Sequence, residues 1–332
     1  MRIYIATYWA TCRGAKEKKA GVDSSAHVKV VSKLKYPYIL ESYHYLTANI
    51  VEAIRKDKAT IFLDSGAFTM FTQGVTVDLE AFATFIKKQA DIIHVASNLD
   101  VIGAGGEALT YERQKTLEKS GVKIQPVFHA RDKDEWLVRY LEEGYDYIFL
   151  GGMVPESTDY LQEWLDRIWD KYLTNADGTP KVKVHGFGLT SSQLMFRYPW
   201  FSVDSTSWVL ASRFGSIMLD LPQRNGSIKD IKVDFSARSK KKEQIGSWHF
   251  ETLKKQEQEA IRARLDFMES NRPKLPELEA ELEKAMGCRQ GFYPEALAAS
   301  YGWRDYANIE YFRRAMDRGV KTFKREQETL FT

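Results

Sequence analysis

The sequence predicts an α/β protein of the (β/α)8 TIM-barrel type, with an N-terminal insertion and a C-terminal helical appendage. Three observations support this prediction. The chain has 332 residues, which is long enough for one barrel and a smaller additional part. Short runs of β-forming residues recur roughly every 25–35 residues, the length of one βα unit. These runs are apolar almost throughout, as expected for parallel strands that are buried on both faces.

Eight of these runs are predicted strands, and each ends in a polar or glycine-containing turn. They are Arg2–Thr7, Thr60–Leu63, Ile92–Ala96, Lys123–Phe128, Tyr147–Leu150, Val182–Gly186, Phe201–Val203 and Ser216–Leu219. Alternation of eight such strands with helices suits a closed parallel barrel better than an open, doubly wound sheet.

The segments between the strands have helical periodicity and helix-end signals. Asp78 can cap a helix whose apolar face includes Phe82 and Ile86. The segment Asp132–Glu135 resembles a capping box, and Gly144 can end the helix that follows it. Ser157 is predicted to open a further helix. Its buried stripe is Leu161, Trp164, Leu165, Ile168 and Trp169.

Two parts of the chain do not fit one simple βα unit. The stretch between Thr7 and Thr60 is too long for a single crossover, so it is predicted to hold an insertion that includes the tyrosine-rich segment Val28–Leu46. From about Ser239 onward helix formers dominate, and no strand pattern returns. The predicted domains are therefore a catalytic barrel over residues 1–238 and a helical appendage over residues 239–332.

Composition limits the class of protein. The formal net charge is only +3, and no apolar run approaches the roughly 20 residues that span a bilayer. A secretory signal pattern is lacking, so a cytoplasmic location is expected. The two cysteines, Cys12 and Cys288, predict neither a disulfide nor a zinc site. The basic runs Lys16–Lys19 and Ser239–Lys242 are read as solvated surface or as phosphate contacts.

Three aspartates stand where predicted strands end. Asp64 follows the second strand, Asp100 the third, and Asp204 the seventh. The active site of a TIM barrel forms at the carboxyl ends of its strands, so these side chains are expected to face one mouth. Converging carboxylates suit acid/base work combined with covalent catalysis at an anomeric carbon. On this pattern alone, a glycosidase fits equally well.

Four segments at strand ends carry a family resemblance. They are Asp64-Ser-Gly-Ala-Phe68, Phe149-Leu-Gly-Gly-Met153, His185-Gly-Phe-Gly-Leu-Thr190 and Val203-Asp-Ser205. In this order they resemble the Asp-Ser-Gly-Gly-Tyr/Phe, Gly-Gly-Leu, Met-Gly-Val-Gly-Thr and Phe-Asp-Cys elements of the tRNA-guanine transglycosylases. The resemblance covers about residues 60–220. It implies a barrel enzyme, a pentosyltransferase, that exchanges guanine in a nucleic acid for a 7-deazaguanine base such as preQ0.

The resemblance also implies roles for the three aspartates. Asp204 would attack C1′ of the target nucleoside and form a covalent glycosyl-enzyme. Asp64 would be the general acid/base, and Asp100 would accept hydrogen bonds from the Watson–Crick edge of guanine. Phe68 would stack on one face of the base. The other implied base-binding residues are Ser65, Gly66, His129, Gly151, Gly152, Met153, His185 and Gly186.

The sequence also departs from the tRNA enzymes. Their Cys-x-Cys-x-x-Cys…His zinc subdomain is absent, and His129 stands where the family tends to have Gln. The chain looks more like the zinc-free phage and bacterial branch that modifies DNA, so DNA is the expected substrate, with tRNA as the alternative. Arg197, Arg213 and Arg224 are then candidates for strand contacts. No metal and no cofactor are expected, and a homodimer or a specificity partner stays open.

Three other interpretations remain open at this point. The first is a glycosidase or nucleoside hydrolase, in which water replaces the incoming base. The second is a non-catalytic nucleic-acid-binding barrel, although such a protein would be expected to lose at least one of the three aspartates. The third is a metal-dependent barrel with His94, His129 and His185 as ligands. No His-x-His or His-x-x-Glu pairing supports that third interpretation.

Overall fold

The computed structural model of the chain describes residues 1–8, 34–74, 76–103, 105–154, 156–239, 248–276, 279–280 and 291–324. Both cysteines, the run Lys16–Lys19 and residues 240–242 lie outside these ranges. The chain divides into two units. Unit 1 comprises Met1–Thr7, Tyr38–Ser205 and Met316–Thr332, and unit 2 comprises Tyr8–Pro37 and Thr206–Ala315.

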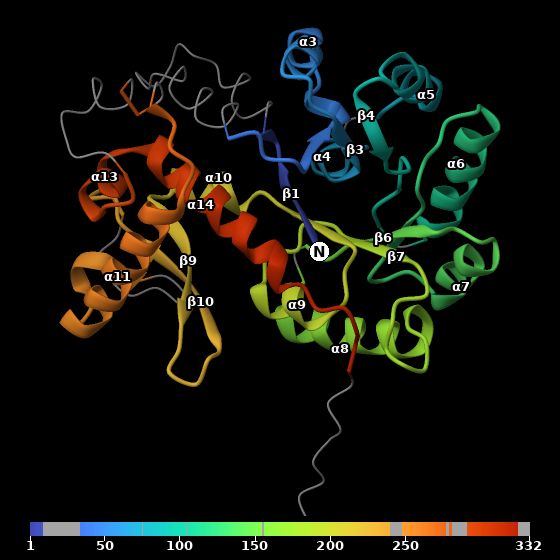
Figure 1. Cartoon of the computed structure of the whole chain (residues 1–332). Coiled ribbons are helices and arrows are strands. Elements are labelled where there is room, and N and C mark those ends of the chain that lie inside the picture. The colour runs from blue at the N-terminus through green and yellow to red at the C-terminus, as the bar shows by residue number, and fades with distance from the viewer. Residues whose placement is uncertain are drawn as a thin grey trace, which may run out of the picture. The chain divides into compact units, whose positions relative to one another are not determined.

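Unit 1 is built around an eight-stranded parallel sheet (Figure 1). Its strands follow the order β4-β3-β2-β1-β8-β7-β6-β5. The strands are β1 Arg2–Ala6, β2 Ile39–Ser42, β3 Ile61–Asp64, β4 Ile93–Ala96, β5 Val127–His129, β6 Tyr147–Gly151, β7 Lys183–Gly186 and β8 Ser202–Ser205. Every pairing between neighbours is parallel. All eight carboxyl ends therefore lie at one end of the sheet.

The sheet is curled, and its two outer strands meet. A parallel bridge joins Ser97, after β4, to Gln125, before β5. The Gln125 N–H donates to the Ala96 carbonyl and the Asn98 N–H donates to the Gln125 carbonyl, both at 2.9 Å. This curled parallel sheet flanked by helices is compatible with a TIM-like α/β fold.

Helices connect the strands of unit 1. They are α3 Ala48–Lys56, α4 Ala67–Gln73, α5 Leu79–Lys88, α6 Glu107–Lys119, α7 Asp134–Glu142, α8 Thr158–Ile168 and α9 Ser192–Arg197, with the short turns η1 Tyr43–Tyr45, η2 Trp169–Leu173 and η4 Met316–Arg318. As predicted, the side chain of Asp78 caps α5 and that of Ser157 caps α8. Gly144 follows α7 with a φ of 81°, as a helix-ending glycine does.

The capping box predicted at Asp132–Glu135 is wrong. The N-cap of α7 is Lys133, whose side chain makes no capping hydrogen bond. The Asp132 carboxylate instead accepts the backbone N–H of His129 at 2.8 Å. This aspartate therefore braces the end of β5 rather than the start of the helix.

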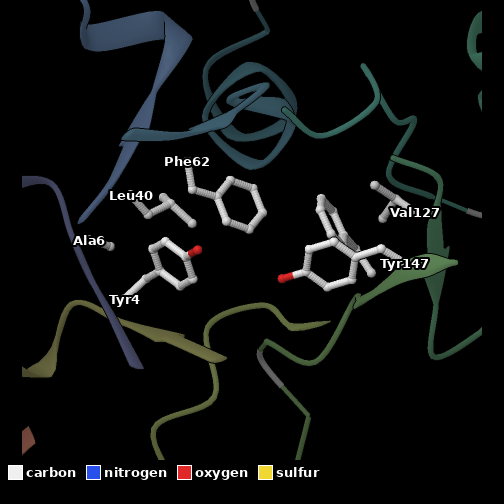
Figure 2. Packing of buried hydrophobic residues seen from close by; sticks show 7 residues of the cluster. Tyr4, Ala6, Leu40, Phe62, Val127 and Tyr147 are labelled. Atoms are coloured by element: carbon white, nitrogen blue, oxygen red, sulfur yellow. The ribbon is translucent and has the colours of Figure 1, made fainter. Parts of the chain in front are cut away.

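The interior of the curled sheet is filled by large side chains that point inward. Its buried cluster consists of Tyr4, Ala6, Leu40, Phe62, Val127, Tyr147 and Phe149. Figure 2 shows the rings of Tyr4, Phe62 and Tyr147 converging from different strands, with both tyrosine hydroxyls directed into the interior. The Phe62 and Phe149 rings lie 4.9 Å apart. This packing closes the interior, so a ligand can reach the sheet only at its ends.

Two strand predictions need correction. The segment Val28–Leu46 was predicted to be an insertion, but its residues Ile39–Ser42 form β2 and pair with β1 and β3. The predicted eighth barrel strand, Ser216–Leu219, instead belongs to β9, which pairs antiparallel with β10 in a separate sheet. The run in β2 is short and contains Glu41, so it lacks an apolar signal, whereas Ser216–Leu219 has a strand pattern that does not show which sheet it joins.

Unit 2 combines a three-stranded sheet with helices. Its elements are α10 Ser207–Arg213, β9 Ser216–Pro222, β10 Ile228–Asp234, β11 Trp248–His249, η3 Phe250–Thr252, α11 Lys255–Asn271, α13 Pro294–Ala299 and α14 Tyr301–Ala315. The strand β11 lies after residue 239, where only helices were predicted. The predicted boundary between residues 238 and 239 falls inside this unit.

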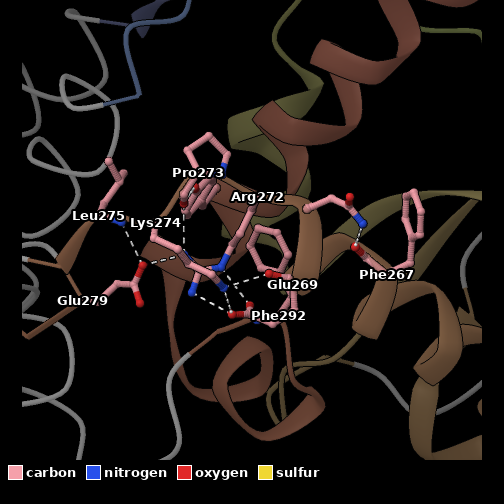
Figure 3. A network of polar contacts seen from close by, with 10 residues as sticks. Phe267, Glu269, Arg272, Pro273, Lys274, Leu275, Glu279 and Phe292 are labelled. Carbon is pink, nitrogen blue, oxygen red and sulfur yellow. Dashed lines mark hydrogen bonds and ion pairs between the residues drawn. The ribbon is translucent and has the colours of Figure 1, made fainter.

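Buried arginines organise unit 2. Arg272, at the end of α11, pairs with Glu269 at 2.8 Å and with Glu279 at 2.5 Å (Figure 3). Its guanidinium also lies 4.9 Å from the Trp303 ring centre. On β9, the buried Asp220 pairs with two further arginines, from α11 and α14. These pairs tie the helices of unit 2 to one another and to its sheet. Among the residues in the ranges given above, no helix is long and apolar enough to span a membrane.

Candidate functional site

The three aspartates stand at the carboxyl ends of their strands in unit 1. Asp64 is the last residue of β3, Asp204 lies in β8, and Asp100 follows β4 in the loop before α6. Burial and the negative charges of Asp100 and Asp204 raise the pKa of Asp64 from 3.8 to about 7. Burial is the larger cause, and the charges of Asp100 and Asp204 add to it because they act on Asp64 through a poorly solvated region. All three aspartates therefore stand at the same end of the sheet, as the positions of the strand ends predicted.

Local hydrogen bonds fix the position of Asp64. Its Oδ2 accepts the backbone N–H of Gly66 at 3.0 Å, and the nearby side chain of Ser42, from β2, favours the ionised form of this carboxyl group and so opposes the rise in its pKa. Gly66 has a φ of 81°, and a Cβ there would lie 2.7 Å from the Ser42 Oγ. Only glycine satisfies both constraints. A carboxyl group with a pKa near 7 can both give and take a proton at neutral pH.

Asp204 is held through one of its oxygens. Its Oδ1 accepts the backbone N–H of Gly188 at 2.8 Å and lies 3.3 Å from Nε2 of His185. Gly188 follows β7 with a φ of 63°, which aims its N–H at the carboxylate. Both contacts involve Oδ1, so Oδ2 is the oxygen of Asp204 that can contact a ligand.

Asp100 is paired with His129. The Asp100 Oδ1 accepts the Ser65 hydroxyl at 3.0 Å, and its Oδ2 lies 2.8 Å from Nε2 of His129. Burial opposes the charge of His129, but its hydrogen bond to Asp100 and the charges of Asp100 and Asp132 raise its pKa overall. Each carboxylate oxygen has two lone pairs. Asp100 is therefore oriented by two side chains and can still accept hydrogen bonds from a ligand.

The two glycines after β6 make room for His129. A Cβ at Gly151 would lie 2.8 Å from Cδ2 of the His129 ring. A Cβ at Gly152 would lie 3.0 Å from the His129 Cβ, and Gly152 also has a φ of 67°. Met153 is buried, with 3% of its surface exposed. The pair Gly151-Gly152 thus permits the close approach of β5 and β6 that brings His129 to Asp100.

Large apolar side chains are exposed on the segments that follow the strands. Phe68 and Phe71, both on α4 directly after β3, are 53% and 60% exposed. Val154, after β6, is 55% exposed. Phe68 stands four residues from Asp64, so it is available for stacking, the role that the family resemblance implies.

Several of the expected base-binding residues are buried, and two of them, His185 and Gly186, pack against aromatic rings. His185 is fully buried, and its ring packs against Phe62, Phe149 and Phe187 at centroid distances of 4.7–5.2 Å. Gly186 is buried against Trp200, whose ring would lie 3.1 Å from an added Cβ. His185 therefore contacts Asp204 from inside the sheet, with its ring fully buried.

The three arginines proposed for strand contacts have different surroundings. Arg197, at the end of α9, makes two hydrogen bonds of 2.8 Å to Asp166 of α8. Its charge is therefore already balanced within unit 1. Arg213, at the end of α10, and Arg224, between β9 and β10, are exposed residues of unit 2.

Sequence reasoning missed several residues that touch the aspartates or their partners. Ser42 was missed because β2 was read as an insertion. Ser202, which bonds to His185, and Tyr147, which bonds to Ser202, lie at inward positions of predicted strands. The alternation of side chains along a strand was the available signal, because Ser202 precedes Asp204 by two residues and so faces the same side.

Histidines and acids do not gather into a metal site in the described ranges, where no group of three or more His, Cys, Asp or Glu is arranged to hold an ion. Nε2 of His94 lies 3.0 Å from the Tyr4 hydroxyl, whereas His129 and His185 contact separate aspartates.

Comparison of the chain with models of known protein families gave no match, and comparison with curated proteins gave none either.

Proposed function

We propose that this protein is a transglycosylase that exchanges guanine in DNA for a 7-deazaguanine base through a covalent aspartyl intermediate. The observation that carries the proposal is that Asp64, Asp100 and Asp204 stand at the carboxyl ends of β3, β4 and β8, where backbone N–H groups of Gly66 and Gly188 hold Asp64 and Asp204. Burial and the charges of Asp100 and Asp204 raise the pKa of Asp64 to about 7, so this carboxyl group can exchange a proton. Neighbouring carboxyl groups in different environments are typical of acid/base assignments in glycosyl transfer.

The proposed reaction has two displacements at C1′. In the first, Oδ2 of Asp204 attacks C1′, the bond from C1′ to N9 of guanine breaks, and protonated Asp64 gives its proton to the departing base. In the second, N9 of the incoming 7-deazaguanine attacks C1′ and releases Asp204, while Asp64 takes the N9 proton. The protein thus returns to its starting state, and the configuration at C1′ is retained.

Base selection is assigned to Asp100 and Phe68. Guanine and 7-deazaguanine present N–H donors at N1 and N2, which require an acceptor such as a carboxylate. Asp100 is held in place by Ser65 and His129 and keeps accepting capacity. The exposed ring of Phe68 can stack on the base. A target base in a duplex would first be flipped out of the helix.

The proposal also specifies the type of fold and the nucleic acid that is modified. The curled sheet would be a (β/α)8 barrel of the TIM type, with its site at the carboxyl ends of the strands. DNA is favoured over tRNA because the motif order is accompanied by no cysteine-rich zinc segment in the sequence. The exposed Arg213 and Arg224 remain candidates for contacts with the strand.

The test is a base-exchange assay with radiolabelled guanine on duplex DNA, single-stranded DNA and tRNA in parallel. Wild type is compared with Asp204→Asn, Asp64→Asn and the control Asp91→Asn. Asp91 is an exposed carboxylate that pairs with Arg55 before β4. We expect label in DNA with wild type and Asp91→Asn, and none above background with Asp204→Asn or Asp64→Asn. A DNA adduct that survives denaturation should form with wild type and be absent from Asp204→Asn.

Each alternative has its own signature in this assay. Label in tRNA alone would overturn the choice of DNA and keep the chemistry. Release of free guanine without incorporation would identify a hydrolase that uses the same carboxylates. Binding of nucleic acid with neither exchange nor release, in wild type as in Asp204→Asn, would identify a non-catalytic binding protein.

A further inference from the structure

A line of four hydrogen-bonding side chains runs from Asp204 into the interior of unit 1. Nε2 of His185 lies 3.3 Å from Oδ1 of Asp204, and Nδ1 of His185 lies 2.6 Å from Oγ of Ser202. Ser202 Oγ in turn lies 2.5 Å from the Tyr147 hydroxyl. Three strands, β6, β7 and β8, supply these residues. Both His185 and Ser202 are fully buried.

The carboxylate at one end fixes the direction of every hydrogen bond in this line. An ionised carboxylate only accepts, so His185 must carry its proton on Nε2 and donate it to Asp204. Burial lowers the pKa of His185, which keeps the imidazole neutral and leaves Nδ1 as an acceptor. The Ser202 hydroxyl must then donate to Nδ1, and the Tyr147 hydroxyl must donate to Ser202 Oγ. Only one placement of the protons along this line satisfies all three hydrogen bonds.

The same three residue types form the triad of serine hydrolases, but here the serine and the aspartate contact the opposite nitrogens of the histidine ring. In that triad the serine contacts Nε2 and the aspartate contacts Nδ1. Here Ser202 contacts Nδ1, and Asp204 contacts Nε2. Ser202 is also fully buried beneath the aspartate, so no substrate reaches its hydroxyl. The arrangement therefore orients the carboxylate of Asp204 and does not activate the serine.

We propose that His185 is the positioning residue of Asp204: fixed as the Nε2–H tautomer by Ser202 and Tyr147, it donates to Oδ1 and presents Oδ2 for attack. This inference rests on the proposed function for its kinetic consequence, but not for the tautomer. The surrounding rings of Phe62, Phe149 and Phe187 prevent His185 from turning away. The role differs from the base-binding role that the family resemblance implied for His185.

The first test reads the tautomer directly and does not depend on activity. The chain has six histidines, so full-length protein labelled with ¹⁵N at histidine gives a tractable long-range ¹H–¹⁵N spectrum. The His185 signal is identified by its loss in His185→Gln. At pH 7.5 we expect a neutral ring protonated on Nε2 alone. A ring protonated on Nδ1, or on both nitrogens, would overturn the proposal.

The second test separates a positioning role from a purely structural one. His185→Leu removes the donor, whereas the amide of His185→Gln can present an N–H near the same place. We expect kcat of base exchange to fall about 10²-fold in His185→Leu, as for a misplaced reacting group, with KM for guanine unchanged. His185→Gln should recover at least tenfold of that loss. The control His249→Leu removes another buried histidine, from β11 of unit 2, and should keep wild-type kcat.

The outcomes distinguish this inference from the proposed function. If kcat of His185→Leu equals that of wild type while Asp204→Asn is inactive, the positioning role is wrong and the transglycosylase proposal stands. If His185→Leu loses activity and His185→Gln recovers none of it, the donor is not the cause and the inference is likewise overturned. If wild type exchanges no base but the spectrum shows the Nε2–H tautomer, the orientation of Asp204 stands and the reaction assigned to it does not.

Discussion

Replacing Asp64 by Asn should stabilise the protein, and by an amount that depends on pH. The pKa of this carboxyl group rises from 3.8 to about 7 on folding, through burial and the charges of Asp100 and Asp204. The folded protein therefore binds a proton at Asp64 more tightly than the unfolded chain does. The resulting stabilisation is complete below pH 3.8 and is lost as the pH rises to about 7. Asn cannot ionise, so Asp64→Asn avoids that loss.

The size of the effect follows from the span of the shift. It covers about three pH units, and each unit corresponds to about 1.4 kcal/mol, which gives an upper value of about 4 kcal/mol. Because Asp64 keeps some contact with solvent, we expect about 2–4 kcal/mol at pH 8. At pH 5 the gain should be smaller by more than half. The Asn side chain can still accept the Gly66 N–H, so the local backbone should not change.

The assay is denaturant unfolding of wild type and Asp64→Asn at half-unit steps from pH 5 to pH 8. Asp91→Asn is the matched control. A hydrogen bond from Arg55 lowers the pKa of Asp91, so this exposed carboxylate stays ionised across the range and its variant should differ from wild type by a constant amount. If the difference between wild type and Asp64→Asn is also constant, Asp64 does not titrate near pH 7. Its assignment as the acid/base then fails.

Three further predictions concern other parts of the chain. Gly151→Ala places a Cβ 2.8 Å from the His129 ring, so the ring must move. If guanine binding weakens by about 1.4 kcal/mol as a result, KM for guanine should rise about tenfold. An unchanged KM would show that His129 does not support the base site. Arg272→Leu removes the buried arginine that pairs with the half-buried Glu269 and Glu279 and should lower the free energy of unfolding by about 2–3 kcal/mol, less than for a fully buried pair, whereas a loss below 1 kcal/mol would contradict this. Arg197→Ala should leave the salt dependence of DNA binding unchanged because Asp166 already pairs with the arginine; a slope reduced by about one would instead indicate a phosphate contact.

Much of the sheet could be predicted from the sequence because buried parallel strands are apolar on both faces. Seven of the eight predicted strands overlap strands of the unit 1 sheet. The missing one, β2, carries the charged Glu41 in a run of only four residues, so it lacks the apolar signal. Ser216–Leu219 has that signal but pairs antiparallel with β10. Local pattern predicts that a strand forms, and pairing depends on residues far away in the chain.

The site was predictable where it depends on the ends of strands. Asp64, Asp100 and Asp204 could be selected because parallel strands bring their carboxyl ends to one side. The side chains that contact these aspartates could not be selected in this way. His185 was expected among the base-binding residues, and only the direction of its side chain within β7 shows that it contacts Asp204. The pairing of His129 with Asp100 depends on the approach that Gly151 permits, a tertiary distance with no local signature.

The way in which unit 1 is divided along the chain has a consequence for synthesis. Its strand β1 pairs Arg2 with Ser202 of β8, and the segment that includes Phe323 follows all of unit 2. At the usual rate of translation, β1 is made on the order of 10–40 s before its neighbour β8. During that time one edge of an apolar strand has no permanent partner, and it can pair with other nascent chains. During expression, chaperones should therefore be needed to protect the first strand, and this need should end only when β8 has left the ribosome.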